Sequence, residues 1–303
     1  MDSSVSKIDS GEARAADYFN PRVDALRRLT KNKTAIAGLI VFIIIVMSCI
    51  CAPLLTKHTY YELNIDLVRA TPSREHILGT DNLGRDMLAR ILYGGRMTLK
   101  IAFVSTILAA IFGSIVGLLS GYFGRRTDFV LSHILDMIAS IPVYLLVIVA
   151  ETAIGWSRGN FMYALALAAV PQFARLVRAS VITTMGYEYI EAARALGVSH
   201  IMIIIRHIFR SVAPQLIVRF TSGVAEALII CSIIGYLGIG ISPPTPEWGL
   251  LAFIGRAYIR TTPLLMGLPC AAITLSVISL SLFGDGLRDV LDPREQALSA
   301  VQK

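Results

Sequence analysis

Charged residues are scarce in this sequence. Asp, Glu, Lys and Arg make up 16% of its 303 residues, whereas 55% of the residues are hydrophobic. Soluble globular domains carry about 25% charged residues, and the mean hydropathy of +0.65 is strongly apolar. The shortage of charge excludes an ordinary soluble domain and predicts a protein that crosses the membrane several times.

Several functional groups are also missing. No P-loop pattern with its Lys and Ser/Thr occurs, so we expect no nucleotide site on this chain. The five histidines are scattered without the spacing of a metal cluster, and no nucleophile stands with a base in facing spans. We therefore expect no metal, no cofactor and no intramembrane enzyme. The cysteines all lie inside apolar runs, where disulfides are not expected: Cys49, Cys51, Cys231 and Cys270.

Long apolar runs are what the sequence does contain. A helix needs about 20 apolar residues to cross the hydrocarbon core. The first 34 residues lack the apolar core and cleavage site of a secretory signal, so we expect the first run to stay in the protein. The fold class predicted is an all-α membrane protein with six transmembrane helices, over 35–55, 101–123, 129–150, 161–178, 220–241 and 261–284.

Basic residues near the ends of these runs predict the topology, because Lys and Arg collect on the cytoplasmic side. We expect a cytoplasmic N-terminal segment (1–34), an extracytoplasmic segment (56–100), a five-helix core (101–290) and a cytoplasmic tail (291–303). The segment 56–100 carries seven basic residues, but five acids are interleaved with them. The net charge of +7 then reflects cytoplasmic loops and anionic membrane lipid, and no nucleic acid is expected as a partner.

Glycine and proline punctuate the spans. Gly113, Gly117 and Gly121 recur at every fourth position and place a smooth stripe on one helix face, which predicts close contact with another helix. Pro142 and two later prolines inside apolar runs favour kinks, at Pro171 and Pro269.

The segment 186–210 is amphipathic although it is too short and too charged to span. Tyr189, Ala192, Ala193 and Leu196 fall at helical spacing and predict one apolar stripe. Gly197 suits a left-handed cap at the end of this helix, and Ser199 suits the start of the next. From these residues alone, the helix either lies on the membrane or docks into another protein.

The same segment resembles a known signature. Glu191-Ala192-Ala193, three residues and then Gly197 are similar to the EAA motif of ABC importer permeases. The resemblance implies that this loop forms a coupling helix, in which Glu191, Ala192, Ala193 and Gly197 contact a cytoplasmic ATPase. Members of that family commonly end the motif with a proline, where this chain has Arg210.

Three further stretches resemble the peptide and nickel branch of these permeases. One holds Gly79-Thr80-Asp81 and Gly84-Arg85-Asp86, and the others cover 243–249 and 284–293. The resemblance covers about 25–295 and is nearest the second, C-type permease of dipeptide, oligopeptide and glutathione importers. From the residues alone, Gly79 and Gly84 permit tight turns. Asp81 and Asp86 can accept from Arg85, from Arg90 or from loop amides, in an ordered loop or in contact with solute.

The resemblance also implies an assembly in the bacterial cytoplasmic (inner) membrane. Its parts are a homologous second permease in a heterodimer, two cytoplasmic ATP-binding subunits that hold the ATP, and an extracytoplasmic solute-binding protein. The solutes implied are di- and oligopeptides, with nickel or metal chelates and glutathione as alternatives. The segment 243–248 would place Trp248 at the membrane edge, either as a stiff loop or as a docking point for the solute-binding protein.

Ionisable residues inside the spans are candidates for the transport path. Glu226 either lines a polar route, pairs with the partner permease or is satisfied by a neighbour. Arg219 precedes it by two turns, which predicts a shared face without direct contact. Asp136 is expected to reach a basic residue near the cytoplasmic end of its span. These acids leave a proton-coupled secondary transporter as the alternative function.

Overall fold

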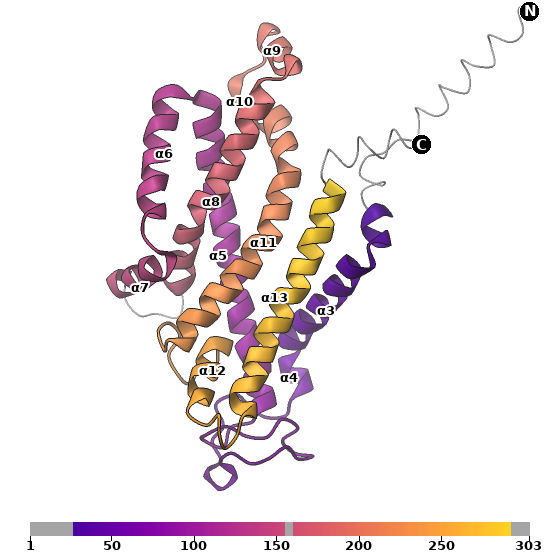
Figure 1. Ribbon diagram of the computed structural model, residues 1–303, viewed down its shortest axis with the longest axis vertical. Coiled ribbons are helices and arrows are strands. Elements are labelled where there is room, and N and C mark those ends of the chain that lie inside the picture. The colour runs from indigo at the N-terminus through magenta and orange to yellow at the C-terminus, as the bar shows by residue number, and fades with distance from the viewer. Residues whose placement is uncertain (1–26, 155–159, 292–303) are drawn as a thin grey trace, which may run out of the picture.

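The computed structural model describes residues 27–154 and 160–291, and in these ranges the chain folds into helices with no strand. Five long helical segments run roughly along the long axis of the molecule (Figure 1). They are α3 (Lys33–Ile50), α5 (Met87–Phe123), α8 (Asn160–Met185), α11 (Phe209–Tyr236) and α13 (Leu264–Leu291). Each of these segments is long and apolar enough to cross a membrane, with α11 joined to the helical residues that precede it.

The expected six spans are obtained when α6 (Arg125–Ala139) and α7 (Val143–Ile154) are counted as one broken span. The two helices meet at an angle of 89°, and α7 lies across the end of α6 (Figure 1). The sequence predicted a kinked helix over 129–150. The break is sharper because Pro142 has no N–H to donate and restricts the residue before it.

Shorter elements complete the two ends of the bundle. One end holds α4 (Ala52–Leu55), the 3-10 turn η1 (Ile65–Leu67) and α12 (Trp248–Arg256). The other end holds α9 (Glu188–Ala195), α10 (His200–Met202) and the π-helix η2 (Ile203–Ile208). The helix α3 begins at the end of the bundle that holds α9, and α13 ends there (Figure 1).

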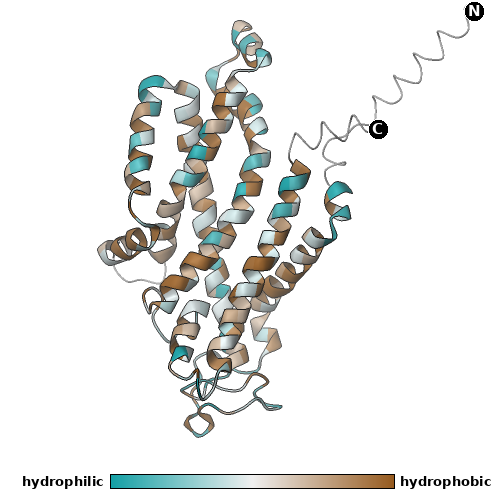
Figure 2. Ribbon diagram, viewed as in Figure 1, coloured by the Kyte–Doolittle hydropathy of each residue, from teal (hydrophilic) through white to brown (hydrophobic). Residues whose placement is uncertain are grey.

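The outer surface of α3 is apolar. Ile40, Ile43, Ile44 and Met47 are exposed there in the isolated chain, and hydrophobic residues cover much of α3 and α13 in Figure 2. Hydrophilic residues mark the α9 end and the start of α6 in the same view. This distribution is the one expected of helices whose sides face lipid or another membrane subunit.

The helix α5 begins at Met87, well before the span predicted from 101. At about 1.5 Å per residue, its 37 residues reach about 55 Å, whereas the hydrocarbon core is about 30 Å thick. The extra turns were missed because Arg90, Arg96 and Lys100 interrupt the apolar run. Arg96 donates from Nε to the carbonyl of Cys49 at 2.6 Å, so its charge is directed at the end of α3.

The glycine stripe of α5 packs against α8, as the sequence predicted. A Cβ added at Gly113 would lie 2.5 Å from Cβ of Phe173, and one at Gly117 would lie 2.5 Å from the carbonyl oxygen of Ala174. At Gly121 it would lie 2.8 Å from Cβ of Val181. The backbones of α5 and α8 therefore approach too closely for any side chain at these three positions.

We expect Gly117→Val to lower the melting temperature of the purified protein strongly. Three atoms of α8 lie within 3.0 Å of the new Cβ, and overpacking of this kind costs about 1–3 kcal/mol. Gly267→Val in α13 is the matched control, because nothing lies within 4 Å of a Cβ there. A Gly117→Val protein that melts at the same temperature as the control would contradict the close packing of α5 on α8.

Candidate functional site

The α9 segment projects from one end of the helical bundle (Figure 1). Gly197 follows α9 with φ of +76°, and the amide of Val198 donates to the carbonyl of Ala193 at 3.1 Å. The hydroxyl of Ser199 accepts from the amide of Met202 at 3.4 Å. The left-handed end of the first helix and the serine cap of the second are therefore confirmed.

The buried face of α9 differs from the predicted stripe. Ile190 and Ala193 are buried, and Ile190 packs with Ile203 and Ile208 of η2. By contrast, Tyr189 is 46% exposed and Leu196 is 84% exposed. Periodicity found the apolar positions, but it did not show that α8 and η2 would cover only the side that holds Ile190.

Glu191 and Ala192 of α9 are exposed, as is Gly197 just after this helix, next to the uncovered apolar side chains. A Cβ at Gly197 would meet nothing within 4 Å. Of the four residues predicted to contact an ATPase, only Ala193 is turned into the chain. The exposed face of α9, formed by Tyr189, Glu191, Ala192 and Leu196, is the part of this segment left free for a partner.

A π-helix, which was not predicted from the sequence, connects this segment to α11. Its residues, Ile203–Ile208, lead without a break into α11, so the helix runs straight through Arg210. The phenol oxygen of Tyr122 lies 2.6 Å from Nδ1 of His200. The loop is thus anchored to the end of α5, and single-turn π segments often mark functional sites.

A second site is a cavity of about 80 Å³ that residues of α5, α7, α8 and α11 line, and it opens to the surface of the isolated chain, where Gln172 and Glu226 are exposed. The guanidinium of Arg219 donates to both carboxylate oxygens of Glu226, each at 2.9 Å. It also donates to the side-chain oxygen of Gln172 and lies over the ring of Phe173, 5.5 Å from the centroid.

The contact between Arg219 and Glu226 corrects the sequence analysis, which predicted a shared face without direct contact. Residues seven apart lie two turns apart on a helix, and the long arginine side chain reaches back over that distance. The carboxylate of Glu226 is half exposed in the isolated chain. The cavity therefore presents a paired acid and base, with Gln172 as an added polar group that the sequence analysis had not selected.

Two other ion pairs join α6 to α8. Asp136 accepts from Nη2 of Arg175 at 2.7 Å, which confirms that this acid reaches a basic residue, and both side chains are exposed. Asp128 accepts hydrogen bonds from Nη2 of Arg178, at 2.6 Å, and from Nε of the same residue. Both pairs hold the two helices together and lie outside the residues that line the cavity.

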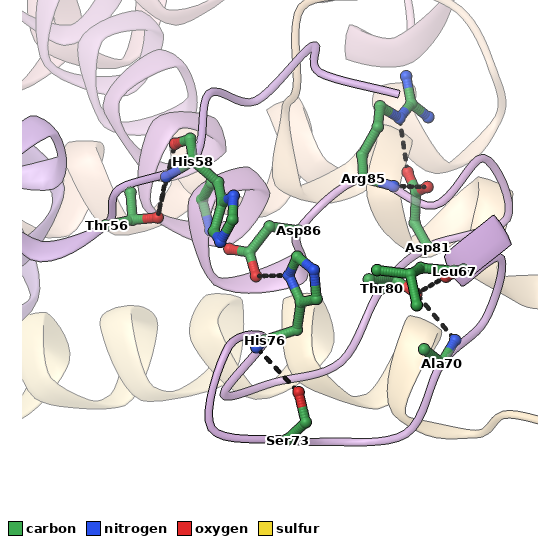
Figure 3. Close-up of polar contacts among 11 residues, drawn as sticks. Thr56, His58, Leu67, Ala70, Ser73, His76, Thr80, Asp81, Arg85 and Asp86 are labelled. Carbon is green, nitrogen blue, oxygen red and sulfur yellow. Dashed lines mark hydrogen bonds and ion pairs between the residues drawn. The ribbon is translucent and has the colours of Figure 1, made fainter. Parts of the chain in front are cut away.

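At the opposite end, the motif that begins at Gly79 forms a tightly bonded loop (Figure 3). Asp81 accepts from Nε of Arg85 and from Nη1 of Arg90, each at 2.7 Å. Gly79 and Gly84 have φ of +76° and +75°, as the turns require. From the sequence, the motif could form either an ordered loop or a contact with solute. The burial of its charged residues supports the ordered loop.

The remaining residues of the motif tie this loop to α5. Thr80 donates to the carbonyl of Leu67 and accepts from the amide of Ala70 at 2.8 Å. Asp86 caps α5 by accepting from the amide of Ala89 at 2.7 Å. Asp81, Arg85 and Asp86 are all buried. The motif therefore fixes how the long loop sits on the start of α5.

The sequence predicted Trp248 as an aromatic residue at the membrane edge, but its side chain is turned into the chain. It is buried, and its indole Nε1 donates to the carbonyl of Ile91 at 2.9 Å. Gly95 leaves room for the ring, because a Cβ there would lie 2.5 Å from the indole. A tryptophan next to prolines is typical of a residue at the membrane edge. The local sequence does not show that Gly95, far away along the chain, leaves space for its ring.

Glu247 is a buried carboxylate that sequence reasoning missed. It caps α12 by accepting from the amides of Gly249 and Leu250, at 2.9 and 2.8 Å, and from the hydroxyl of Thr98 at 3.0 Å. Burial raises the pKa of Glu247, and these hydrogen bonds lower it in part. The residue joins α12 to α5, and the available signal was an acid at the start of a helix, where negative charge is favourable.

Comparison with known proteins places this fold in a family. Residues 113–296 match the model of the "Binding-protein-dependent transport system inner membrane component", and residues 20–72 match the "N-terminal TM domain of oligopeptide transport permease C". A chain in a solved structure of the MetNI methionine ABC transporter, in an inward-facing conformation, has a TM-score of 0.57 at 21% identity, over 67% of this chain and 97% of that one. That likeness supports the type I importer fold.

Curated relatives span nearly the whole chain. The dipeptide transport system permease of Alkalihalophilus pseudofirmus is 40% identical over 91% of this chain and 90% of its own length. A probable D,D-dipeptide permease of Escherichia coli is 32% identical, and a glutathione permease of Pectobacterium atrosepticum is 34% identical, each over 88% of this chain and 89% of the relative. This chain therefore belongs to the permease family of binding-protein-dependent ABC importers.

Proposed function

We propose that this chain carries peptides across the bacterial cytoplasmic membrane, driven by ATP that separate subunits bind and hydrolyse. The observation that carries the proposal is the exposed face of α9, where the apolar side chains of Tyr189 and Leu196 are left uncovered by the rest of the chain. Similarity to dipeptide permeases supports peptides as the solute class.

The charges on α9 favour a protein partner over a lipid surface. Helices that lie on membranes carry many Lys and Arg on their polar face, because the inner leaflet is anionic. Here the polar residues are Glu188, Glu191 and one basic residue, Arg194. An acidic first turn beside exposed Tyr189 and Leu196 fits a groove in a cytoplasmic ATPase better than it fits lipid.

Docking of ATPases at α9 sets the proposed orientation. The end that holds α9 would be cytoplasmic, and both termini would lie on that side, since α3 begins and α13 ends there (Figure 1). Arg125, Arg126 and Arg206 belong to the same end, as the positive-inside rule requires. The loop at 56–86 would then face the solute-binding protein.

A second, homologous permease would complete the transport path. The cavity around Arg219 and Glu226 lies within one chain, but the carboxylate of Glu226 is half exposed. A partner packed on this face would enclose the polar groups away from lipid, as buried charges in membranes require. The paired acid and base also suit solutes that carry both charges, as peptides do.

Affinity purification of the tagged chain from native membranes tests this assembly. We expect two copies of cytoplasmic subunits with P-loops and one homologous permease to purify with it. Unlabelled dipeptides should suppress uptake of a labelled dipeptide more strongly than glutathione or nickel does. Recovery of the chain alone, with uptake driven by a proton gradient, would instead support the secondary transporter.

A further inference from the structure

Two histidines that are far apart in the sequence meet one carboxylate at the end of the molecule opposite α9. One ligand atom from each of His58, His76 and Asp86 lies within 4.8 Å of the other two. Figure 3 shows the two imidazoles beside the carboxylate. His76 and Asp86 are only 6% and 4% exposed, and His58 is half-buried. The spacing of the histidines along the sequence predicted no metal cluster, because these three residues meet only in the folded chain.

The three groups match the donor set of a transition-metal site. Zinc binds imidazole nitrogen and carboxylate oxygen at about 2.0–2.2 Å in tetrahedral geometry. Ligand atoms around such an ion lie about 3.3 Å apart, and Nδ1 of His76 is already 2.9 Å from Oδ1 of Asp86. The ring of His58 lies 4.6 Å from that of His76, between centroids, so small side-chain rotations would bring the donors around one ion.

Each of the three residues is held in place by contacts that leave its donor atom available. Oδ2 of Asp86 accepts from the amide of Ala89, which leaves Oδ1 for the cluster. The amide of His76 donates to Ser73 at 3.0 Å, and the amide of His58 donates to Thr56 at 3.1 Å. The Ala89 contact orients the Asp86 carboxylate, as hydrogen bonds to a ligating group do in metal sites, and the two amide contacts fix the backbone at His76 and His58.

The surroundings leave room for a fourth ligand. A hollow of about 350 Å³ borders His58 and Asp86, and Lys57, Arg74 and Glu75 line it as well. Water can enter there and complete the coordination, as in open zinc sites with three protein ligands. The charges of Lys57 and Arg74 are partly offset by Glu75 and by the carboxylate of Asp86.

We propose that His58, His76 and Asp86 bind a divalent transition-metal ion of the Zn²⁺ class. The ion would join three segments: the residues after α4, the loop that carries His76 and the residue that caps the start of α5. It would therefore stiffen the long loop between α4 and α5, which the bond between Arg85 and Asp81 already anchors near the start of α5. This site stands apart from the proposed transport function, since none of its residues lines the cavity at Glu226.

Binding of Zn²⁺ alone to the purified full chain in nanodiscs tests the proposal. We expect one ion per chain, with affinity at least about 100-fold weaker in His58→Ala and in His76→Ala, since loss of neighbouring contacts alone costs 10–100-fold. Zn²⁺ should also raise the melting temperature of the wild-type chain by about 5 °C at saturation and leave the two variants unchanged.

Matched variants separate this site from the other donors in the chain. His133→Ala with His207→Ala removes two histidines outside the cluster and should leave the affinity for Zn²⁺ unchanged. Asp86→Asn keeps an oxygen to cap α5 and should weaken binding while the protein remains folded. Absence of stoichiometric Zn²⁺, full affinity in His58→Ala, or a thiolate charge-transfer band with Co²⁺ would each overturn the proposal.

Discussion

Glu191→Lys combined with Gly197→Pro is expected to lower ATP-driven uptake by at least about tenfold while the membrane bundle stays folded. Proline fixes φ near −65°, whereas Gly197 has φ of +76° and donates from its amide to the carbonyl of Arg194 at 3.0 Å. Gly197→Pro therefore changes the direction in which the chain leaves α9. The lysine places the opposite charge on the exposed face beside Leu196.

Gly197→Asn is the matched control for this variant, because asparagine tolerates the left-handed conformation better than other residues with a Cβ. Its uptake should stay close to that of the unmodified transporter. The melting temperature of Gly197→Asn should change little, since nothing lies within 4 Å of a Cβ at Gly197. Proline strains the backbone there, but the strain is confined to the loop after α9, so the double variant should still purify as a folded membrane protein. Normal copurification with ATPases and full uptake in the double variant would contradict the coupling role of α9.

Arg219→Ala has the second largest expected effect. The substitution leaves Glu226 without the guanidinium that binds both of its oxygens and removes a donor to Gln172. Breaking a fully buried pair costs about 3–5 kcal/mol, and half exposure of Glu226 reduces this to about 1–2 kcal/mol. We expect uptake to fall about tenfold, measured against the amount of assembled transporter.

Arg175→Ala is the control for loss of an ion pair. It breaks the bond to Asp136, where both side chains are exposed, and should change uptake less than about twofold. The double variant Arg219→Glu with Glu226→Arg restores a pair of opposite charges, and it should recover part of the uptake that Arg219→Ala loses. Equal uptake in Arg219→Ala and Arg175→Ala would contradict a role for the cavity in transport.

Hydropathy predicted the spans well because long apolar runs leave few structural choices in a membrane. It placed the start of α5 too late, since Arg90 and Arg96 look external until their partners are known. Arg90 is bonded to Asp81, nine residues away, and Arg96 to the end of α3. A hydropathy average treats each charge as unpaired, so it fails where the fold pairs the charges.

The local turns were predictable, whereas the long-range contacts were not. Gly197, Gly79 and Gly84 require left-handed backbone wherever they serve as caps or tight turns, and the structure has it at all three. The buried side of α9 depends on η2, and the burial of Trp248 depends on Gly95. The contact of His58 with His76 is also set by tertiary folding.

The coupling segment and the cavity together describe a subunit that supplies a path and receives its driving force from outside. The single measurement that tests this most directly is dipeptide uptake by the purified complex, with its solute-binding protein, in proteoliposomes loaded or not loaded with ATP. The account predicts uptake only with ATP, at a rate that does not depend on a proton gradient. Uptake without ATP that collapses when the proton gradient is removed would contradict it.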